Sequence, residues 1–272
     1  GMYAVPKTFI ETMKIKAKIY EYIRLYANRR QVVSKRIRGV IDGASWIWAI
    51  TEQEKVCIEK VRKNIVSTML ETGTNDILQK KIRNKSAVKR LKICWSGSHQ
   101  SIKELPLLLY ALSEIKDDEI MLLVLGDGPE TNSWKEIADK LKLKNIIWYG
   151  RLNHSRALEI MSESDLLVHT SIREGTPHVV LEALSLGLPV ICHNACGMGE
   201  VVNDKCGIKI PLINRDESIK DFINAILLLK NNPEELRRKS DGAYERAQEL
   251  SWGEKVKEIS QTYLRVLGEI SN

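Results

Sequence analysis

The sequence lacks several features that would place it in a common class of protein. It has no run of 18 uncharged apolar residues, so we expect no membrane-spanning helix, and no charged-then-apolar leader opens it, which favours the cytoplasm. Its five cysteines include no Cys-x-x-Cys pair, so we expect reduced thiols and no metal site. The spacings of a P-loop, a dinucleotide-binding glycine fingerprint and a nucleophile elbow are also missing, which argues against those modes of nucleotide binding and hydrolysis.

Acidic residues are scarce in the first third of the chain. Residues 1–92 hold 21 Lys and Arg against 8 Asp and Glu, a net charge of +13, whereas residues 93–272 hold 21 against 27, a net charge of −6. An ordinary solvated surface would explain the basic excess, but so would contact with an anionic membrane face. Because no aromatic and basic interleaving of an RNA-binding module accompanies it, we expect no nucleic-acid partner.

Residues 8–30 have the pattern of a basic amphipathic helix. Such a helix could lie on the inner face of a membrane or pack on its own domain, and the sequence leaves both alternatives open. The expected apolar stripe consists of Met13, Ala17, Tyr20, Ile23 and Ala27.

From residue 91 onward, short apolar runs alternate with stretches of helical length. The runs predict strands at 91–96, 120–125, 145–149, 165–170, 189–193 and 206–210. The remaining stretches predict helices at about 103–115, 130–143, 154–163, 177–187, 216–231, 233–249 and 251–269. Near-continuous apolar strands between helices are typical of a parallel sheet covered on both faces. We therefore predict an α/β fold with a doubly wound parallel sheet.

Before residue 91 the pattern is less regular. An apolar strand is expected to end at Ile50, and Thr51 with Glu54 forms a capping box that starts a helix running to about residue 63. A second strand is expected at 65–71. The boundaries that follow are an incomplete first domain at 1–75, a charged linker at 76–90, a ligand-binding domain at 91–250 and a last helix at 251–272.

Residues 165–193 combine three signals that point to a ligand site. A buried strand at 165–170 leads into a short loop, Thr176 is the expected N-cap of a helix that opens near Pro177, and Gly187 is its expected stop. An apolar run then restarts the sheet. The loop thus lies at the carboxyl end of a parallel strand, where open α/β sheets bind their ligands.

Two carboxylates stand out in this stretch. Glu182 is the only charge on an otherwise apolar helix, and a buried carboxylate must find hydrogen-bond donors such as sugar hydroxyls. Glu174 lies in the loop before the helix N-terminus, whose unpaired N–H groups suit a phosphate or a developing anion. One acid is therefore expected beside the anion site and the other about a turn deeper.

Glu174-Gly175-Thr176-Pro177, followed by Leu181-Glu182-Ala183 and Gly187-Leu188-Pro189-Val190, resembles the Glu, seven residues, Glu signature of the group 1 retaining glycosyltransferases of the GT-B fold. The resemblance implies transfer of a hexosyl group from a UDP-sugar or GDP-sugar to a saccharide or lipid-linked acceptor, in surface polysaccharide or lipopolysaccharide biosynthesis. It implies that Glu174 contacts the donor sugar and supports the charge that develops at transfer. Glu182 would hold the ribose, with Gly175 and Thr176 in the binding loop.

The same resemblance assigns roles to the loop at 95–103. Relatives place a Gly-Arg pair and then a Lys there, and these cations neutralise the diphosphate, so that no metal or other cofactor is needed. Gly97 and Lys103 match this pattern, but Ser98 replaces the Arg, for which Arg151 or Arg173 could compensate.

Two further glycine turns are expected at the same edge of the sheet. Gly126 and Gly128 would lie near the nucleotide, and the backbone of Gly150 and Arg151 would hold its base, although a plain turn is equally open for both. His169 is expected to be a buried core residue rather than a base.

The resemblance also makes residues 1–75 the remnant of an acceptor domain that is normally about twice as long, and 251–272 a helix that crosses back to it. Two alternatives stay open. The chain could be a non-catalytic nucleotide-sugar-binding subunit that needs another chain for the acceptor half, or it could catalyse another GT-B reaction, such as that of an epimerase or a phosphorylase.

Overall fold

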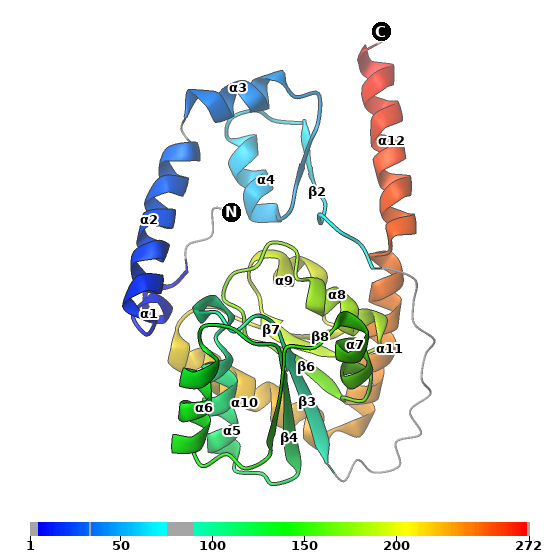
Figure 1. Cartoon of the computed structure of the whole chain (residues 1–272). Helices are drawn as coiled ribbons and strands as arrows, with labels where there is room; N and C mark the ends of the chain where they lie inside the picture. The colour runs from blue at the N-terminus through cyan, green and yellow to red at the C-terminus, as the bar shows by residue number, and fades with distance from the viewer. Residues whose placement is uncertain (1–4, 33, 75–89, 271–272) are drawn as a thin grey trace.

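The computed structural model of the protein describes residues 5–32, 34–74 and 90–270 (Figure 1). Within them, a six-stranded sheet with helices on both faces forms one part, and the helices and two short strands of the first 74 residues lie beside it. The predicted linker at 76–90 falls outside the described residues, apart from Arg90. None of the helices among the described residues is long and apolar enough to cross a membrane.

The large sheet is parallel throughout and has the order β5-β4-β3-β6-β7-β8. The chain lays down β3, β4 and β5 outward in one direction and then returns to place β6 on the other side of β3. The crevice outside the carboxyl ends of β3 and β6 is therefore the topological switch point, where doubly wound sheets bind ligands. The strands are β3 (Leu91–Ser96), β4 (Ile120–Leu125), β5 (Ile146–Gly150), β6 (Leu166–His169), β7 (Val190–His193) and β8 (Gly207–Ile210). The predicted fold class is confirmed.

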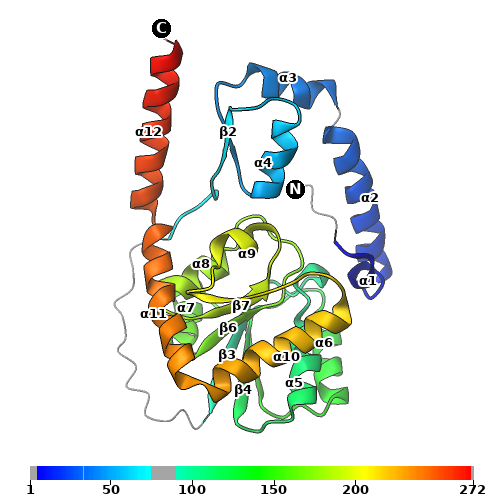
Figure 2. The same cartoon turned by 180° about the vertical axis from the view of Figure 1, so that it is seen from behind.

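The large sheet lies between two apolar clusters, one on each of its faces. Trp95 packs with Leu107 and Phe222, whereas the preceding residue, Cys94, packs with Val180 on the other face, as the alternation of a strand requires. Each fully buried large apolar side chain contributes about 1.5–3 kcal/mol to the stability. Helices α5 (Leu105–Ile115), α6 (Thr131–Lys140) and α10 (Arg215–Asn231) cover the first face, and α7 (His154–Ser162), α8 (His178–Ser185) and α11 (Pro233–Glu249) cover the second (Figure 2).

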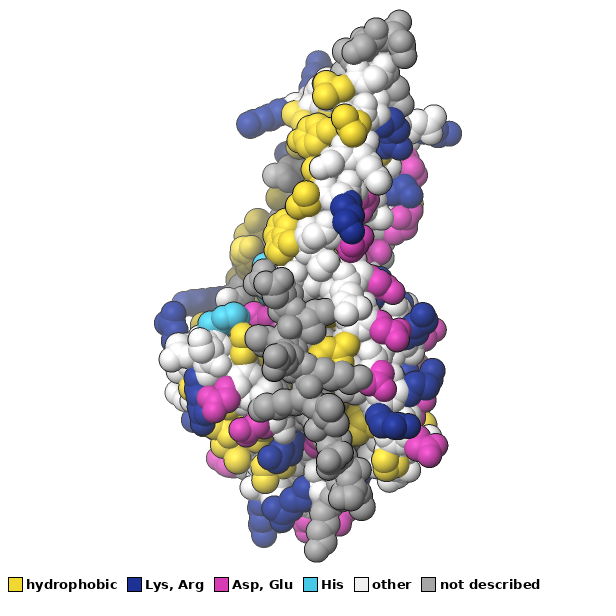
Figure 3. All heavy atoms as spheres, turned by 90° about the vertical axis from the view of Figure 1, so that its right-hand side faces the viewer, with side chains coloured by type: hydrophobic (Ala, Val, Ile, Leu, Met, Phe, Trp, Pro, Cys, Tyr) yellow, Lys and Arg dark blue, Asp and Glu magenta, His cyan; other side chains and the backbone are white. Residues whose placement is uncertain are grey.

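The first 74 residues contain a small parallel sheet of two strands. They comprise α1 (Lys7–Ile10), α2 (Ile15–Val32), α3 (Lys35–Gly43), β1 (Ile47–Ala49), α4 (Glu52–Glu59) and β2 (Val66–Thr68). The Thr51 half of the capping box is confirmed, since Thr51 Oγ1 accepts from Glu54 N over 3.3 Å, while the Glu54 carboxylate accepts from Ile50 N over 3.2 Å. Helix α12 (Trp252–Ile270) extends alongside this part, where the rings of Trp48 and Tyr263 meet at 6.0 Å. Figure 3 shows apolar side chains gathered along the side of the molecule that α12 forms.

The prediction of one helix over 8–30 is wrong, because the chain breaks between α1 and α2. Phe9, Ile10 and Met13 are buried in the core of the large sheet, and the Phe9 ring meets that of His193 edge-on at 6.1 Å. Tyr20, by contrast, is 62 % exposed. Within the expected stripe, Met13 is therefore buried and Tyr20 is exposed. The division of the chain at residue 75 stays a prediction.

The helices differ from the prediction in two further places. The helix expected at 103 begins at Leu105, because residues Ser101–Lys103 form a 3-10 turn and Glu104 takes a left-handed φ of 44°. A short helix, α9 (Cys196–Val201), was not expected at all.

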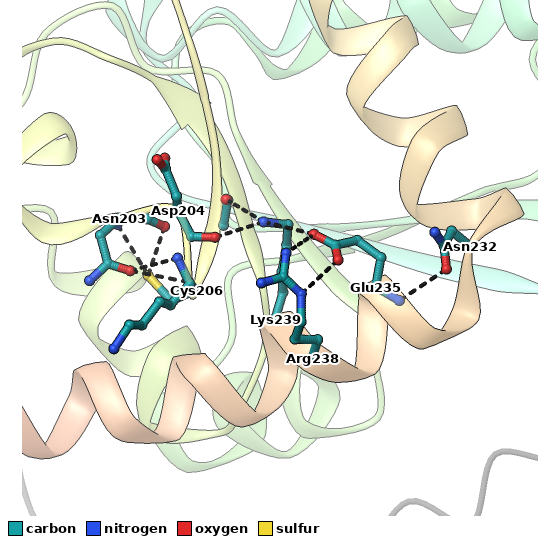
Figure 4. A network of polar contacts seen from close by, with 9 residues as sticks. Asn203, Asp204, Cys206, Asn232, Glu235, Arg238 and Lys239 are labelled. Atoms are coloured by element: carbon teal, nitrogen blue, oxygen red, sulfur yellow. Dashed lines mark hydrogen bonds and ion pairs between the residues drawn. The ribbon is translucent and has the colours of Figure 1, made fainter.

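Helix α11 is fixed to the loop before β8 by a buried cation (Figure 4). Lys239, 5 % exposed, donates to the carbonyl oxygens of Asp204 and Gly207 over 2.9 and 3.1 Å and pairs with Glu235. One turn further along the helix, a Cβ added at Gly242 would overlap the carbonyl oxygen of Lys205. The helix therefore packs directly on backbone at this point.

Gly242→Ala should destabilise the protein although alanine favours helices. The clash with a fixed backbone atom should lower the free energy of unfolding by about 1–3 kcal/mol, the usual cost of overpacking. The matched control is Gly39→Ala in α3, where no atom lies within 4 Å of the added Cβ and a gain of roughly 0.5–1 kcal/mol is expected. Urea unfolding measures both, and equal effects of the two substitutions would contradict the packing described here.

Candidate active site

The switch point is lined by two loops that are joined by hydrogen bonds. The loop after β3 ends in the 3-10 turn, and the loop after β6 leads to α8. Ile172 N donates to Ile102 O over 3.0 Å, and Thr170 Oγ1 donates to Lys103 O over 2.7 Å. Trp95 Nε1 in turn donates to Thr170 Oγ1 over 2.9 Å. The sheet core thus holds both loops in a fixed relation.

These loops bring Lys103, Glu174 and His169 together. Lys103 Nζ forms an ion pair with Glu174 Oε2, and His169 Nε2 lies 3.4 Å from the same oxygen. The Glu174 side chain is 20 % exposed and the His169 side chain 2 %. The expectation that His169 is buried is confirmed, but its ring faces a candidate catalytic carboxylate, a contact that the sequence did not indicate.

The electrostatics of the cluster favour an ionised Glu174. Burial alone would raise the pKa of the Glu174 carboxyl, but the contacts with His169 and Lys103 lower it to about 2. Burial lowers the pKa of His169, which is therefore neutral at pH 7. The site presents a carboxylate and an ammonium group side by side, with 20 % and 13 % of the Glu174 and Lys103 side chains exposed.

Glu182 lies on α8 between buried neighbours, but its side chain is 33 % exposed. It is therefore not sunk in the helix as expected. Its Oε1 lies 2.9 Å from His154 Nε2, at the start of α7. Among the described residues, no ion pair or hydrogen bond joins Glu182 to Glu174. No feature of the sequence indicates a role for His154, which lies 28 residues upstream.

Thr176 does not cap α8 as expected. Its Oγ1 accepts from Glu71 N over 3.2 Å, so this hydroxyl ties the loop to the chain after β2. The N-cap position is Pro177, which provides no side-chain acceptor, and the helix begins at His178. The Gly175 carbonyl packs on α9, where a Cβ added at Gly197 would overlap its oxygen, whereas Gly175 itself is exposed and no atom lies within 4 Å of its Cβ position.

The expected glycine turns meet at one edge of the sheet. Gly97 N donates to Leu125 O over 3.1 Å, and Gly126 N donates to Gly150 O over 2.9 Å. Gly126 has a φ of 112°, and a Cβ there would overlap the carbonyl oxygen of Gly97. Gly128 likewise leaves no room for a Cβ, which would lie 2.9 Å from His99 N. The turns at the ends of β3, β4 and β5 therefore pack backbone against backbone.

His99 supports these turns and was not singled out from the sequence. The fully buried ring stacks near Trp134, with centroids 4.9 Å apart, and its Nδ1 lies 2.7 Å from Thr131 Oγ1. Its backbone N–H donates to Asp127 O over 2.9 Å. Burial lowers the pKa of His99 to about 4, so a neutral ring fixes the turn.

The two cations proposed to compensate for Ser98, Arg151 and Arg173, have different surroundings. Ser98 and Arg151 are exposed. Arg173 Nη2 is held by Glu21 Oε1 of α2 at 2.6 Å, and the Glu21 side chain is 2 % exposed. Glu21, from the first part of the chain, is another residue near the site that the sequence did not reveal. No cluster of three His, Cys, Asp or Glu that could hold a metal forms among the described residues.

Comparisons of the chain with a family model and with curated proteins agree on one family. Residues 77–246 match the family model of the glycosyl transferases group 1. The chain is 29 % identical over 180 residues to the alpha-monoglucosyldiacylglycerol synthase of Streptococcus pneumoniae, covering 62 % of this chain and 40 % of the relative. It is 29 % identical over 122 residues to the lipopolysaccharide glucosyltransferase WaaG of Escherichia coli, covering 44 % and 32 %.

Solved structures show the same fold. The HepE protein of Anabaena, crystallised in complex with UDP, superposes with a TM-score of 0.67 at 18 % identity, covering 82 % of this chain and 64 % of that one. The chain thus spans less than half the length of the two curated relatives and about two thirds of this structure.

The stability of the protein should depend on Glu174 with a defined pH profile. A carboxyl with a pKa of about 2 in the folded state and an ordinary 4.5 when unfolded stabilises the fold above pH 4.5, and this contribution is lost as the pH falls toward 2. Glu174→Gln, which resembles the protonated acid, should lower the free energy of unfolding at pH 7 by roughly 3 kcal/mol. The difference from wild type should shrink between pH 4.5 and 2.

Urea unfolding at pH 7, 5, 4 and 3 measures this profile. Glu163→Gln, at an exposed acid after α7, is the control and should change little. A difference between wild type and Glu174→Gln that stays constant over this pH range would show that Glu174 is not held ionised by its neighbours.

Proposed function

The chain belongs to the group 1 glycosyl transferases, and we propose that it serves the retaining transfer of a hexosyl group from a nucleotide-diphosphate sugar to a saccharide or lipid-linked acceptor. The observation that carries this proposal is the contact of Lys103 with an ionised Glu174 at the switch point of the sheet. An ammonium group and a carboxylate at one crevice can stabilise the two opposite charges that develop when a glycosidic bond to a diphosphate breaks.

Lys103 supplies the positive charge for the departing diphosphate. The first N–H groups of α8 add to it, since Pro177 leaves them without a side-chain cap. Glu174 faces the sugar and supports the positive charge that builds on its ring in the transition state. Loss of one such preorganised contact raises a barrier by about 3 kcal/mol.

The nucleotide lies along the turns at the ends of β3, β4 and β5. The turns of Gly97, Gly126 and Gly128 lie beside it, while the backbone of Gly150 and Arg151 holds its base. Ser98 lies in the first of these turns and contributes a hydroxyl instead of the usual cation. Glu182 binds the ribose hydroxyls, and His154 must release the Glu182 carboxylate when the ribose enters.

The names of relatives favour a role in glycolipid, surface polysaccharide or lipopolysaccharide synthesis. UDP bound to a neighbour of the same fold favours a UDP-sugar, with a GDP-sugar as the other donor. The basic helix α2, whose Ile19, Tyr22 and Ile23 are exposed, is suited to peripheral contact with the inner face of a membrane. This assignment places the protein in the cytoplasm.

A second candidate function is that of a non-catalytic nucleotide-sugar-binding subunit. The two-stranded sheet of residues 47–68 favours it, because such a small sheet offers little surface for binding an acceptor. Transfer to an added acceptor by the purified chain would reject this alternative. Nucleotide binding with transfer only after mixing with another polypeptide would support it.

Glu182→Ala should weaken nucleotide binding while leaving the fold intact. Removing a carboxylate that accepts from ribose hydroxyls should lower the affinity roughly tenfold to a hundredfold, as expected for a charged hydrogen bond. Calorimetric titration with UDP and with GDP measures this, with Glu163→Ala as the exposed control. Unchanged affinity of Glu182→Ala for whichever nucleotide binds the wild type would overturn the assignment.

Nucleotide binding should survive chelation of divalent cations. Lys103 and the N-terminus of α8 supply the charge that a metal ion provides in other transferases. The affinity for the bound nucleotide should therefore change less than twofold when EDTA is added to the titration. A tenfold loss that magnesium restores would require a metal in the site and count against this role of Lys103.

A further inference from the structure

A cavity of about 990 Å³ lies between α2 and the loops of the large sheet. Ile102 and Arg173 both line it, and they directly precede Lys103 and Glu174 in the sequence. The cavity therefore reaches the loop backbone that carries the candidate catalytic pair. Its volume is at the upper end of the range of small-molecule sites.

The lining is mainly apolar. Apolar side chains of α2 and its approach line one side, and residues of the two loops line the other, among them Met13, Ile15, Ala17, Tyr20, Ile102 and Pro129. Ile15 and Tyr20 are 75 % and 62 % exposed. Large apolar side chains that face an open cavity gain stability when a ligand covers them.

The charges around the cavity are mostly compensated. Lys14 pairs with Glu130 at 2.8 Å, and Arg173 pairs with Glu21 at 2.6 Å. Lys16 is exposed at the rim. A strongly anionic ligand such as a second nucleotide would have to break these pairs, whereas an apolar chain with an uncharged hydroxylated end would leave them in place.

We propose that this cavity binds the apolar aglycone of the glycosyl acceptor and so selects acceptors that carry an alkyl or lipid chain. This inference rests on the proposed transferase function and names the substrate class of that site. The sugar or hydroxyl end of the acceptor points past Ile102 and Arg173 toward Glu174, and the chain lies along Met13, Ala17 and Tyr20 on α2.

The test uses n-octyl β-D-glucoside, below its micelle-forming concentration, as a probe with an apolar chain. Saturation-transfer NMR on the full chain measures its affinity, and methyl β-D-glucoside reports binding of the sugar alone. The octyl compound should bind, with the strongest saturation on its chain, and the methyl compound should bind at least tenfold more weakly. Equal affinity of the two would overturn the role of the aglycone.

Three substitutions on α2 locate the binding. Ala17→Trp fills the cavity and should weaken octyl glucoside binding at least tenfold, whereas Ala27→Trp, away from the cavity, should change it less than twofold. Tyr20→Ser removes an exposed apolar wall without adding volume and should weaken binding several-fold, which keeps the test valid if Ala17→Trp does not fold. Equal affinities in Ala17→Trp, Tyr20→Ser and Ala27→Trp would place the detergent elsewhere and overturn the proposal.

Titration with UDP and GDP on the same samples separates the two proposals. The affinity for nucleotide should be unchanged in all three variants, since all three residues lie on α2 and not in the glycine turns of the proposed nucleotide site. If a nucleotide binds and octyl glucoside does not, the cavity assignment alone fails. If neither nucleotide binds to the wild type, the proposed function fails with it.

Discussion

The site depends on one carboxylate that stays ionised in a place largely closed to water. Burial alone would raise the pKa of the Glu174 carboxyl toward the neutral form, which could not stabilise positive charge. Lys103 and His169 reverse this, and they come from different loops and strands. The parallel strand order that places β6 beside β3 is what brings them together. The ionised state of Glu174 therefore depends on the order of the strands in the sheet.

Most of the sheet could be predicted because fully buried parallel strands are near-continuous apolar runs, such as 91–96 and 120–125. The contact between Lys103 and Glu174 could be anticipated only in part, from two motifs on neighbouring strands. The break between α1 and α2 could not. Packing against residues far away in the chain, including His193, fixes the positions of Phe9 and Met13. Local periodicity in the sequence does not reveal such distant contacts.

Individual hydrogen-bond partners were the least predictable feature of the site. Thr176 has the right side chain for a local cap, but its hydroxyl accepts from Glu71, 105 residues away. Arg173 is held by Glu21, at a separation of 152 residues. In each case the sequence analysis identified the polar side chain. Its partner in the structure, however, comes from a distant part of the chain. The nature of the residues was predictable, whereas their pairing was not.

The first part of the chain is fastened to the part that holds the large sheet at both of its ends (Figures 1 and 2). On one side, Phe9 and Ile10 of α1 are embedded in the core. On the other, Thr74 N donates to Leu250 O over 2.9 Å and Trp252 N donates to Thr74 O over 3.2 Å. Between these ends, the ion pair of Arg173 with Glu21 adds a further attachment beside the candidate site. A rigid separation of the two parts would therefore have to break this ion pair and expose Phe9 and Ile10 to water.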